Sequence, residues 1–329
     1  MTMSSHQPLI SVIVVSFNTR DILRACLQRL FSVTLDLRLQ VIVVDNASRD
    51  ASADMVAQEF PDVCLIRSDI NLGFAAANNL GFLQAKGDYV LLLNPDALLE
   101  PDALQRALAY MEADPAIGMG GGLLLGKDGQ REPSARLFPS LLNEALVLSG
   151  LAARYPKSRF FGRFDRTWDD SGQATAVDWV PGAFALMRRE ALDKVGPFDE
   201  RFFLYYEEVD LCRRFKAEGW KITYWPDVVI RHWGGESSKT VENQDFSSSG
   251  SQLTLWRMRS QLLYYRKHHG ALVARGVAAL ESNWHSLRAW RARRQGQQRK
   301  AQESGRVVAL MRQAWRETDG GRTSPARPW

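Results

Sequence analysis

Two groups of acidic residues in this chain have the residue types and spacing needed to bind a metal ion and to act as a general base. The segment 91–96 (LLLNPD) places Asp96 directly after an apolar run typical of a buried strand. A carboxylate there can hold a divalent cation, and the cation can hold a diphosphate. Asn94 can add an amide or water-mediated contact. On these residues alone, the alternative is that Asp96 only caps the helix expected next.

The second acidic group is in residues 202–214 (FFLYYEEVDLCRR), where aromatic side chains lead into Glu207, Glu208 and Asp210. A helix is expected to begin here, and its dipole favours negative charge at that end. Neighbouring carboxylates repel one another and can raise one pKa, which suits a general base. The alternative is an acidic cluster that only caps the helix. The preceding aromatics favour the wall of a buried cleft.

His232 lies in the segment 229–235 (VIRHWGG), after an expected strand. A neutral imidazole can bind a metal ion. The neighbouring Trp233 is equally consistent with a packing role, so both interpretations stay open at this point.

The first 113 residues predict an α/β fold with a mostly parallel sheet flanked by helices. Strand-like apolar runs alternate with helical patterns, an order typical of right-handed strand–helix–strand units. The strands are expected at 9–16, 41–44, 63–67 and 89–93, and helices at 51–60, 75–85 and 101–113. A polar turn follows each strand, at 16–18, 45–48, 71–74 and 94–96. Ligands bind at this edge in such sheets.

The later part of the chain is less regular. Residues 114–178 are expected to be extended segments and a mobile loop that covers the site. A strand is expected within 177–188, helices at 190–195 and 208–218, a strand at 221–225 and a flexible loop at 234–251. The predicted organisation is a single α/β domain over 1–253, with one half at 8–113 and a second half at 114–253. A helical basic region at 254–319 and a disordered tail at 320–329 would follow.

The C-terminal region is strongly basic. Residues 257–329 contain 16 Lys or Arg and 4 Asp or Glu, although the whole chain has a net charge of only +5. Its expected helix has one apolar stripe: Val273, Val277, Leu280, Trp284 and Leu287. We expect this helix to lie on an anionic membrane surface. The alternatives are packing on the catalytic domain, a dimer contact or a solvated face, whereas nucleic acid is not an expected partner because no binding motif accompanies the charge.

Three separated cysteines, Cys26, Cys64 and Cys212, offer neither a disulfide framework nor a zinc motif. No apolar run has the length of a signal-peptide core or a membrane span. We therefore expect a reducing, cytoplasmic environment, with the protein peripheral to the inner face of the cell membrane.

The chain resembles family 2 inverting glycosyltransferases of the GT-A fold over about residues 8–269. The motifs in the family's order are SVIVVSFN, VIVVDNASRD, NLGFAAANNLGF with LLLNPDA, and the long segment from Trp179 to Trp220. Within the family it is similar to the bacterial rhamnosyltransferase branch, in which Asn-Pro-Asp often replaces Asp-x-Asp.

This resemblance implies a role for each matching residue. For the nucleotide-sugar donor, Asp45 would bind the pyrimidine edge. The other donor-binding positions would be Ser16, Phe17, Asn18, Asn71, Gly73, Asn78, Asn94 and Asp96. The candidates for a contact with the donor diphosphate are Arg213, Arg259 and Lys267. Asp96 and His232 would bind Mg²⁺ or Mn²⁺. Glu208 would be the catalytic base, with Glu207 orienting it or contacting the acceptor.

The chain departs from the family pattern at two positions. Asn94 replaces the first metal-binding Asp, and Glu208 stands where the base is often Asp, so Glu207 and Asp210 remain alternatives. For the acceptor, Trp179, Gly182 and Ala183 could form a stacking surface, or Trp179 could belong to the core.

The activity implied by the resemblance is transfer of L-rhamnose from dTDP-rhamnose to a polyprenyl-diphosphate-linked glycan in cell-surface polysaccharide synthesis. The alternatives are another donor, such as UDP-galactofuranose or a UDP-hexose, or a non-catalytic nucleotide-sugar-binding protein.

Overall fold

The computed structural model describes residues 7–169, 172–233 and 251–325. They fall into two compact units. The first, which we call the sheet unit, comprises Met1–Phe138, Asp169–Asp199 and Glu208–Thr240. The second, which we call the helical unit, comprises Pro139–Trp168, Glu200–Glu207 and Val241–Trp329. Two internal segments of the predicted catalytic domain, Pro139–Trp168 and Glu200–Glu207, thus group with the helical unit, and the division at residue 253 stays a prediction.

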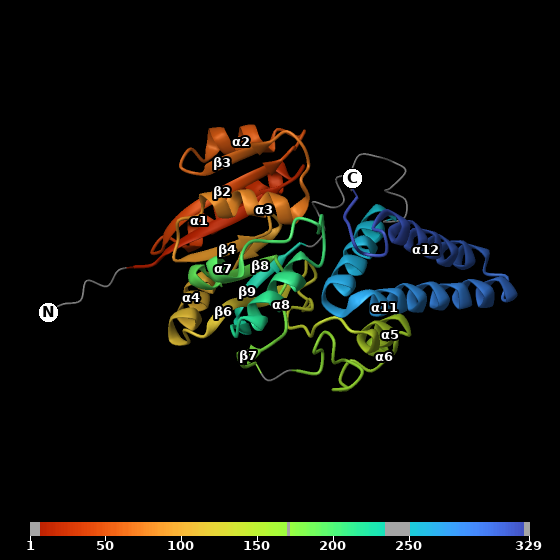
Figure 1. The fold of residues 1–329 in the computed structure, drawn as a ribbon. Coiled ribbons are helices and arrows are strands. Elements are labelled where there is room, and N and C mark those ends of the chain that lie inside the picture. Colours follow the sequence, from red (N-terminus) through yellow and green to blue (C-terminus); the bar gives the residue numbers. More distant parts are fainter. Residues whose placement is uncertain (1–6, 170–171, 234–250, 326–329) are drawn as a thin grey trace. The chain divides into compact units, whose positions relative to one another are not determined.

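A mixed sheet of nine strands among the described residues forms the centre of the sheet unit (Figure 1). The strand order is β3-β2-β1-β4-β8-β6-β9-β5, with β7 paired to β9. Six strands run parallel to one another and β5, β7 and β8 run opposite, which confirms the predicted α/β class with a mostly parallel sheet. The strands are β1 Leu9–Ser16, β2 Arg38–Asn46, β3 Cys64–Ser68, β4 Tyr89–Leu93, β5 Ala97–Leu99, β6 Ile117–Leu125, β7 Thr175–Ala176, β8 Phe184–Arg188 and β9 Lys221–His232.

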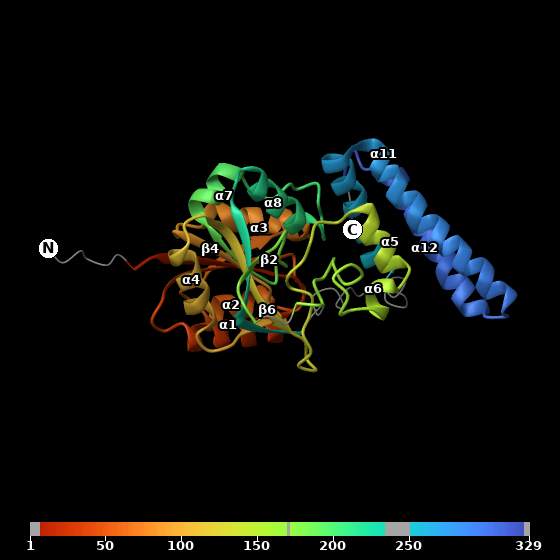
Figure 2. The ribbon, with the colours of Figure 1, turned by 90° about the horizontal axis from the view of Figure 1, so that it is seen from below.

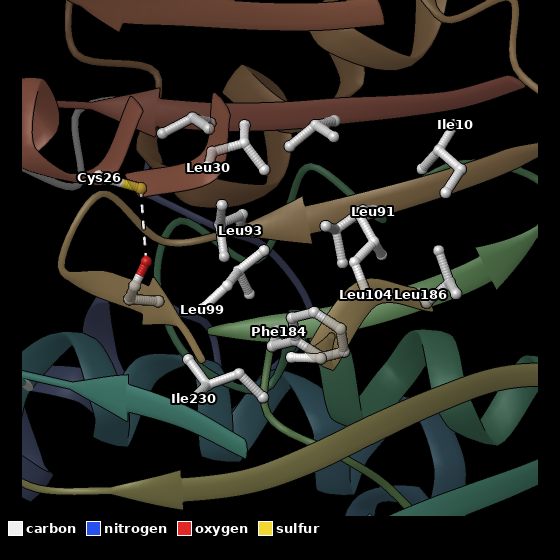
Figure 3. Close-up of a cluster of buried hydrophobic side chains, with 14 of the residues drawn as sticks. Ile10, Cys26, Leu30, Leu91, Leu93, Leu99, Leu104, Phe184, Leu186 and Ile230 are labelled. Atoms are coloured by element: carbon white, nitrogen blue, oxygen red, sulfur yellow. Dashed lines mark hydrogen bonds between the residues drawn. The ribbon is translucent and has the colours of Figure 1, made fainter. Parts of the chain in front are cut away.

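Helices cover both faces of this sheet. Figure 2 shows α1, α2 and α4 on one face and α3, α7 and α8 on the other. Their bounds are α1 Arg20–Val33, α2 Ser52–Glu59, α3 Gly73–Gln84, α4 Ala103–Ala113, α7 Arg189–Val195 and α8 Glu207–Ala217. Alternate residues of β1 point to opposite faces. Ile10 packs with Leu30 of α1 and Leu104 of α4 in the core drawn in Figure 3, while Ile13 packs against Gly81 of α3.

The region 114–178 is more ordered than the sequence suggested. It contains β6 and two helices, α5 Leu141–Leu148 and α6 Leu151–Arg154. Residues 155–168 then fold back on themselves, because Thr167 donates a hydrogen bond from Oγ1 to the Pro156 carbonyl (2.6 Å) and Gly162 donates one from its amide to the Ser158 carbonyl (2.8 Å). The predicted mobile loop is thus wrong for these described residues.

The helical unit is built on two long helices, α11 Ser251–Arg294 and α12 Gln298–Glu317. Gly270 has φ of 82° and interrupts α11. Apolar side chains from both helices form the core of this unit: Leu255, Met258, Leu262, Met311 and Ala314.

The C-terminal end differs from the predicted disordered tail. The amides of Gly320 and Gly321 donate to the carbonyls of Trp315 and Thr318 at 2.8 and 3.0 Å, which extends hydrogen-bonded turns past α12. Residues 326–329 and the predicted flexible loop at 234–250 lie outside the described residues. None of the helices described for this chain combines the length and the apolar character that crossing a bilayer requires.

Glycines in β6 admit a large aromatic side chain into the core. Trp225 on the neighbouring strand β9 is fully buried. A Cβ atom on Gly120 would fall within the ring of Trp225, which leaves no room for any other residue.

We therefore predict that Gly120→Ala lowers the free energy of unfolding by about 1–3 kcal/mol through overpacking. Gly305→Ala is the matched control, since Gly305 lies inside α12 with open space around its Cα. This control should raise stability by about 0.5–1 kcal/mol. Urea unfolding followed by circular dichroism measures both, and equal effects would contradict the packing argument.

Candidate active site

The carboxyl ends of β1 and β2 bring Ser16 and Asp45 together, since they are partners in the strand register. Asp45 is 4% exposed, and its Oδ2 accepts a hydrogen bond from the Ser48 amide (3.2 Å). Its Oδ1 is buried without a hydrogen-bond partner among the described residues. Burial raises the pKa of this carboxyl, although hydrogen bonds from Ser48 oppose the shift. The site therefore presents an acceptor oxygen that has room for a donor.

Two loops beside Asp45 brace each other. Asn18 has φ of 52° and Ala47 has φ of 67°, left-handed conformations that an ordinary side chain seldom adopts. Asn18 accepts a hydrogen bond on Oδ1 from the Arg49 amide (2.7 Å) and donates its own amide to Ser48 Oγ (2.9 Å). Asn18 thus shapes the loop at this edge, where Phe17 is half-buried.

The start of α3 is held by an asparagine that the sequence interpretation left in a turn without a role. Asn46 donates from Nδ2 to Asn71 Oδ1 (2.9 Å) and accepts on Oδ1 from the Leu72 amide (2.8 Å). Asn71 Oδ1 also accepts from the amide of Gly73, whose φ is 80°. Asn71 and Gly73, both predicted to be donor-binding, therefore lie beside Asp45 at the same edge.

Asn78 is placed differently from Asn71. It is 1% exposed and donates a hydrogen bond from Nδ2 to the Phe74 carbonyl (2.9 Å), one turn earlier in α3. Its side-chain amide therefore binds the backbone of its own helix, which indicates a structural role. The predicted contact with the sugar gains no support from this geometry.

The antiparallel pairing of β5 with β9 brings Asp96 and His232 together. Ala97 is the register partner of His232, and the Trp233 amide donates to the Asp96 carbonyl (2.9 Å). His232 Nε2 is buried and lies 3.5 Å from Asp96 Oδ1, an ion-pair contact too long and poorly aligned to count as a hydrogen bond. The two predicted metal ligands therefore converge although 136 positions separate them in the sequence.

The other ring nitrogen of His232 contacts Glu132, which the sequence interpretation missed. His232 Nδ1 and Glu132 Oε2 are 2.7 Å apart. Burial lowers the pKa of His232, but the negative charges of Asp96 and Glu132 outweigh it and raise the pKa above its ordinary value. A carboxylate on Nδ1 orients the ring and leaves Nε2 as the ligand atom, as in many metal-bound histidines.

This pair fits a divalent cation only in part. The described residues contain no group of three or more His, Cys, Asp and Glu side chains that could hold a metal ion. Asp96 Oδ1 and His232 Nε2, which face each other at 3.5 Å, supply two ligand atoms. Hard cations take about six oxygen or nitrogen ligands, so the remaining ones would have to come from water and a substrate diphosphate.

The predicted acceptor segment meets Asn94 at the end of β4. The Asn94 amide donates to the Ala183 carbonyl (3.0 Å), and a Cβ on Gly182 would press on the Phe74 ring at 3.2 Å. Trp179 is only 5% exposed and donates from Nε1 to the Leu137 carbonyl (2.8 Å). Trp179 therefore belongs to the core, which is one of the two alternatives that the sequence left open.

Arg136 is a second residue that the sequence interpretation missed. Its guanidinium stacks over the Trp179 ring at 4.5 Å, and its amide donates to the Trp179 carbonyl (3.3 Å). Arg136 also lies close enough to Glu208 for its charge to lower the pKa of that carboxyl. It comes from the region predicted to be irregular, so no periodic pattern marked it.

Glu208 stands in the first turn of α8 and has the properties of a base. Its Oε2 is buried without a hydrogen-bond partner among the described residues. Burial raises the pKa of Glu208, and Arg136 and nearby backbone amides only partly offset this shift. Asp210 is less suited, because its fully buried carboxylate forms an ion pair with Arg214 (2.9 Å).

Glu207 comes directly after a backbone elbow formed by Tyr205 and Tyr206. Both tyrosines have φ of 69°, an uncommon conformation for a bulky residue. The helical unit holds Tyr206, whose ring packs on Tyr264 at 5.4 Å and whose hydroxyl lies 3.4 Å from Glu144 Oε1. The division between units falls between Glu207 and Glu208. The elbow therefore connects the helical unit to the helix that carries the candidate base.

Arg259, predicted to contact diphosphate, has another partner. It is 8% exposed and pairs with Glu317 at 2.6 Å inside the helical unit. Its charge is already compensated there, so the structure does not support the predicted contact. The other two candidates stack on rings, Arg213 on Phe138 at 5.3 Å and Lys267 on Phe202 at 5.8 Å.

A surface depression of about 790 Å³ lies away from these residues, beside the amino end of β4. It is lined by Tyr89, Glu112 and Arg188, which hydrogen-bond to one another. These side chains satisfy each other, and none of the predicted site residues lines the depression.

The arrangement of sheet, loops and acidic residues defines the class of protein. A mannosyltransferase from Pyrobaculum calidifontis, solved with GDP-Man and Mn²⁺, superposes with a TM-score of 0.54 at 18% identity, covering 96% of this chain and 76% of that chain. The shared architecture is the GT-A fold. The family model named glycosyl transferase family 2 matches residues 11–196, and the chain belongs to this family.

Curated relatives place the chain with the bacterial rhamnosyltransferase-like branch. The N-acetylglucosaminyl-diphospho-decaprenol L-rhamnosyltransferase of Mycobacterium tuberculosis is 30% identical over 243 residues, which are 70% of this chain and 78% of that protein. The rhamnosyltransferase WbbL of Escherichia coli is 25% identical, covering 78% of this chain and 92% of that protein. The family and branch predicted from the sequence motifs are thus confirmed.

We predict that Glu132→Gln weakens binding of Mn²⁺ about 10–100-fold, because a neutral amide no longer orients the His232 ring as a carboxylate does. Titration calorimetry with Mn²⁺ in the presence of nucleoside diphosphate measures this effect. Glu100→Gln is the matched control, since Glu100 pairs with Arg231 beside the same strands. An equal loss in both variants would remove Glu132 from the site.

Proposed function

We propose that this chain is an inverting glycosyltransferase that moves L-rhamnose from dTDP-rhamnose to a hydroxyl of a lipid-linked glycan. One observation supports the chemistry most directly. The buried side-chain atoms that lack a hydrogen-bond partner among the described residues include Asp45 Oδ1, His232 Nε2 and Glu208 Oε2. Buried polar atoms are normally satisfied, so each is explained best as a ligand contact. Each atom belongs to a residue with a substrate-facing role in the resemblance.

The nucleotide would bind at the edge shared by β1 and β2. Asp45 Oδ1 would accept the N–H of the pyrimidine ring, and the braced loops at Asn18 and Asn71 would enclose the base and ribose. Uracil and thymine present the same edge to Asp45. The preference for dTDP therefore depends on the named relatives, and UDP-galactofuranose or a UDP-hexose stays the alternative donor.

Asp96 and His232 would hold Mg²⁺ or Mn²⁺ against the donor diphosphate, with Glu132 fixing the imidazole. The bound cation would supply stabilisation of the charge that develops on the leaving nucleoside diphosphate. Asn94 would add a neutral contact to this group, in place of the Asp that many family members have there.

Glu208 would act as the general base. Its Oε2 would take the proton from the acceptor hydroxyl while the hydroxyl oxygen attacks the anomeric carbon. The bond to the diphosphate breaks on the opposite face, so one displacement inverts the configuration. Asp210 stays paired with Arg214, and Glu207 would contact or orient the acceptor.

The acceptor would enter beside Gly182 and Ala183, where Gly182 has no side chain to block close approach. The printed name of the Mycobacterium tuberculosis relative describes a decaprenol diphosphate carrying N-acetylglucosamine. A similar polyprenyl-linked glycan is the proposed acceptor here, used at the inner face of the cell membrane for cell-surface polysaccharide.

A donor panel tests the proposed function. The protein is incubated with dTDP- and UDP-sugars, with and without Mn²⁺ or Mg²⁺, and release of nucleoside diphosphate is measured with a polyprenyl-diphosphate N-acetylglucosamine acceptor. Metal-dependent turnover of dTDP-rhamnose, with the inverted anomer identified by NMR, is the expected result. Turnover of UDP-sugars but not of dTDP-rhamnose would identify a UDP-sugar as the donor. Binding of donors without turnover of any of them would favour a non-catalytic role.

We predict that Glu208→Gln abolishes transfer, lowering kcat by at least about 100-fold, because an amide cannot take the proton. The donor dissociation constant should stay within about twofold, since the donor contacts are elsewhere. Glu207→Gln is the matched neighbour and should retain more activity. Near-normal turnover by Glu208→Gln would exclude Glu208 as the base.

The raised pKa of Glu208 has a consequence for the pH profile. A base must be deprotonated to act, so kcat/KM should rise with pH as Glu208 loses its proton. Because burial raises this pKa, the acidic limb should lie above the range of a solvated glutamate. The limb should disappear from the residual activity of Glu208→Gln, and an unchanged limb in that variant would assign it to another group.

A further inference from the structure

The helical unit exposes apolar side chains around α5. Leu141, Leu142 and Val147 are 40%, 42% and 46% exposed, and Leu272 on α11 is 85% exposed. Figures 1 and 2 show α5 beside α11. A Cβ on Gly276 would lie 3.7 Å from the Leu141 side chain, and Leu272 is one helical turn before Gly276. Leu141 and Leu272 are therefore neighbours on one surface.

The segment after α6 adds aromatic rings to this part of the unit. Phe160 is 52% exposed and Tyr155 is 45% exposed. Their rings are held by packing on Phe161, at centroid distances of 5.3 and 5.2 Å. The hydrogen bonds that fold residues 155–168 back on themselves keep these rings at fixed positions. An exposed, rigid aromatic pair is typical of contact with the interface between lipid and water.

Cations surround the aromatic rings. The segment 139–168 contains five Lys or Arg and only two acidic residues. One of the two, Glu144, points inward and accepts a hydrogen bond from the Tyr265 hydroxyl (3.1 Å). Arg154, Lys157 and Arg159 are exposed. The segment that carries the exposed rings is therefore net positive and has exposed cations close to these rings in the sequence.

Most residues of the apolar stripe predicted for membrane contact pack inside the helical unit. Val277 is 1% exposed, and Val273, Leu280 and Trp284 are half-buried. The helices α11 and α12 pack against each other, and Ala278 contacts the core cluster that contains Met311. Of the stripe, Leu287 stays exposed, together with the nearby Trp290.

We propose that Leu141, Leu142, Tyr155, Phe160 and Leu272 form a face, the α5 face, that docks the helical unit onto an anionic phospholipid bilayer. Apolar and aromatic side chains would enter the interface, while the flanking cations would attract the negative headgroups. Docking would bring the enzyme to the membrane surface that carries the proposed lipid-linked acceptor. Only this benefit rests on the proposed function.

Vesicle co-sedimentation of the full chain tests the α5 face. Vesicles of phosphatidylcholine alone are compared with vesicles containing one quarter phosphatidylglycerol. The expected result is binding to the anionic vesicles that salt weakens. Replacing Arg154, Lys157 and Arg159 by Gln should reduce partitioning at least about tenfold, since each cation near a charged surface contributes about 1 kcal/mol.

Two further variants separate the α5 face from other surfaces. Leu142→Gln with Phe160→Gln should also reduce partitioning at least about tenfold, through loss of apolar contact. Leu287→Gln with Trp290→Gln is the matched control on α11 and should change it less than about twofold. Circular dichroism and the thermal midpoint check that each variant is folded. Absence of vesicle binding, unchanged binding of both α5-face variants, or loss in the α11 control alone would overturn the proposal.

A water-soluble acceptor distinguishes this failure from failure of the proposed function. The α5-face variants should transfer sugar to a short-chain soluble acceptor at the native rate, and should lose activity only with acceptor in vesicles. Vesicle binding without any transfer would refute the proposed function and leave the docking face standing. Transfer without vesicle binding would refute the docking face and support the proposed function.

Discussion

The pairing of β5 with the end of β9 is the contact on which the candidate site depends. β5 has only three residues, Ala97–Leu99, yet it fixes Asp96 against His232 through the register of Ala97 with His232. The chain from Asn94 to Ala97 is in turn anchored to the start of β8 and to Cys26 of α1. A short edge strand can hold two ligand residues here because its own Ala97 and Leu99 are buried in the core of the sheet unit.

The site combines strong positioning with unsatisfied polar atoms. Hydrogen bonds fix the loops at Asn18 and Asn46, and Glu132 fixes the ring of His232. The atoms that would meet a substrate, such as Glu208 Oε2, lack such partners. Leaving a buried polar atom unpaired costs about 1–3 kcal/mol. A ligand that satisfies these atoms would therefore recover stability that the empty sheet unit lacks.

The sequence predicted most of the sheet because the relevant signal is local. The bounds of β1 and β4 match the prediction at every residue, since both are short, mostly apolar runs whose central residues are buried on two faces. The strand β9 continues past the predicted end at Trp225 to His232. Pro226 normally disfavours a strand, but the pairing of the later residues with β5 outweighs this local signal. The helix α5 was missed because its sequence LLNEALVL is too short and too uniformly apolar to show a helical period.

The site was predicted less completely than the fold. Asp96, His232 and Asp45 were found because each follows a recognisable strand or motif. Glu132 and Arg136 were not found, because their roles come from contacts between distant segments that no periodic pattern records. Trp179 and Arg259 have aromatic and basic side chains that suit a substrate, but burial and the partners Leu137 and Glu317 give them structural roles.

The helical unit is assembled from three separate stretches of chain, and the stretch that ends at Glu207 contains the elbow at Tyr205 and Tyr206. Left-handed backbone costs a non-glycine residue roughly 1–2 kcal/mol, so the elbow persists only while its aromatic neighbours hold it. Recombination between relatives at a single crossover near residue 250 would separate these stretches and mismatch the elbow with its supports. A chimera that exchanges the helical unit would therefore have to take residues 139–168 and 200–207 together with the C-terminal helices, as one inherited module.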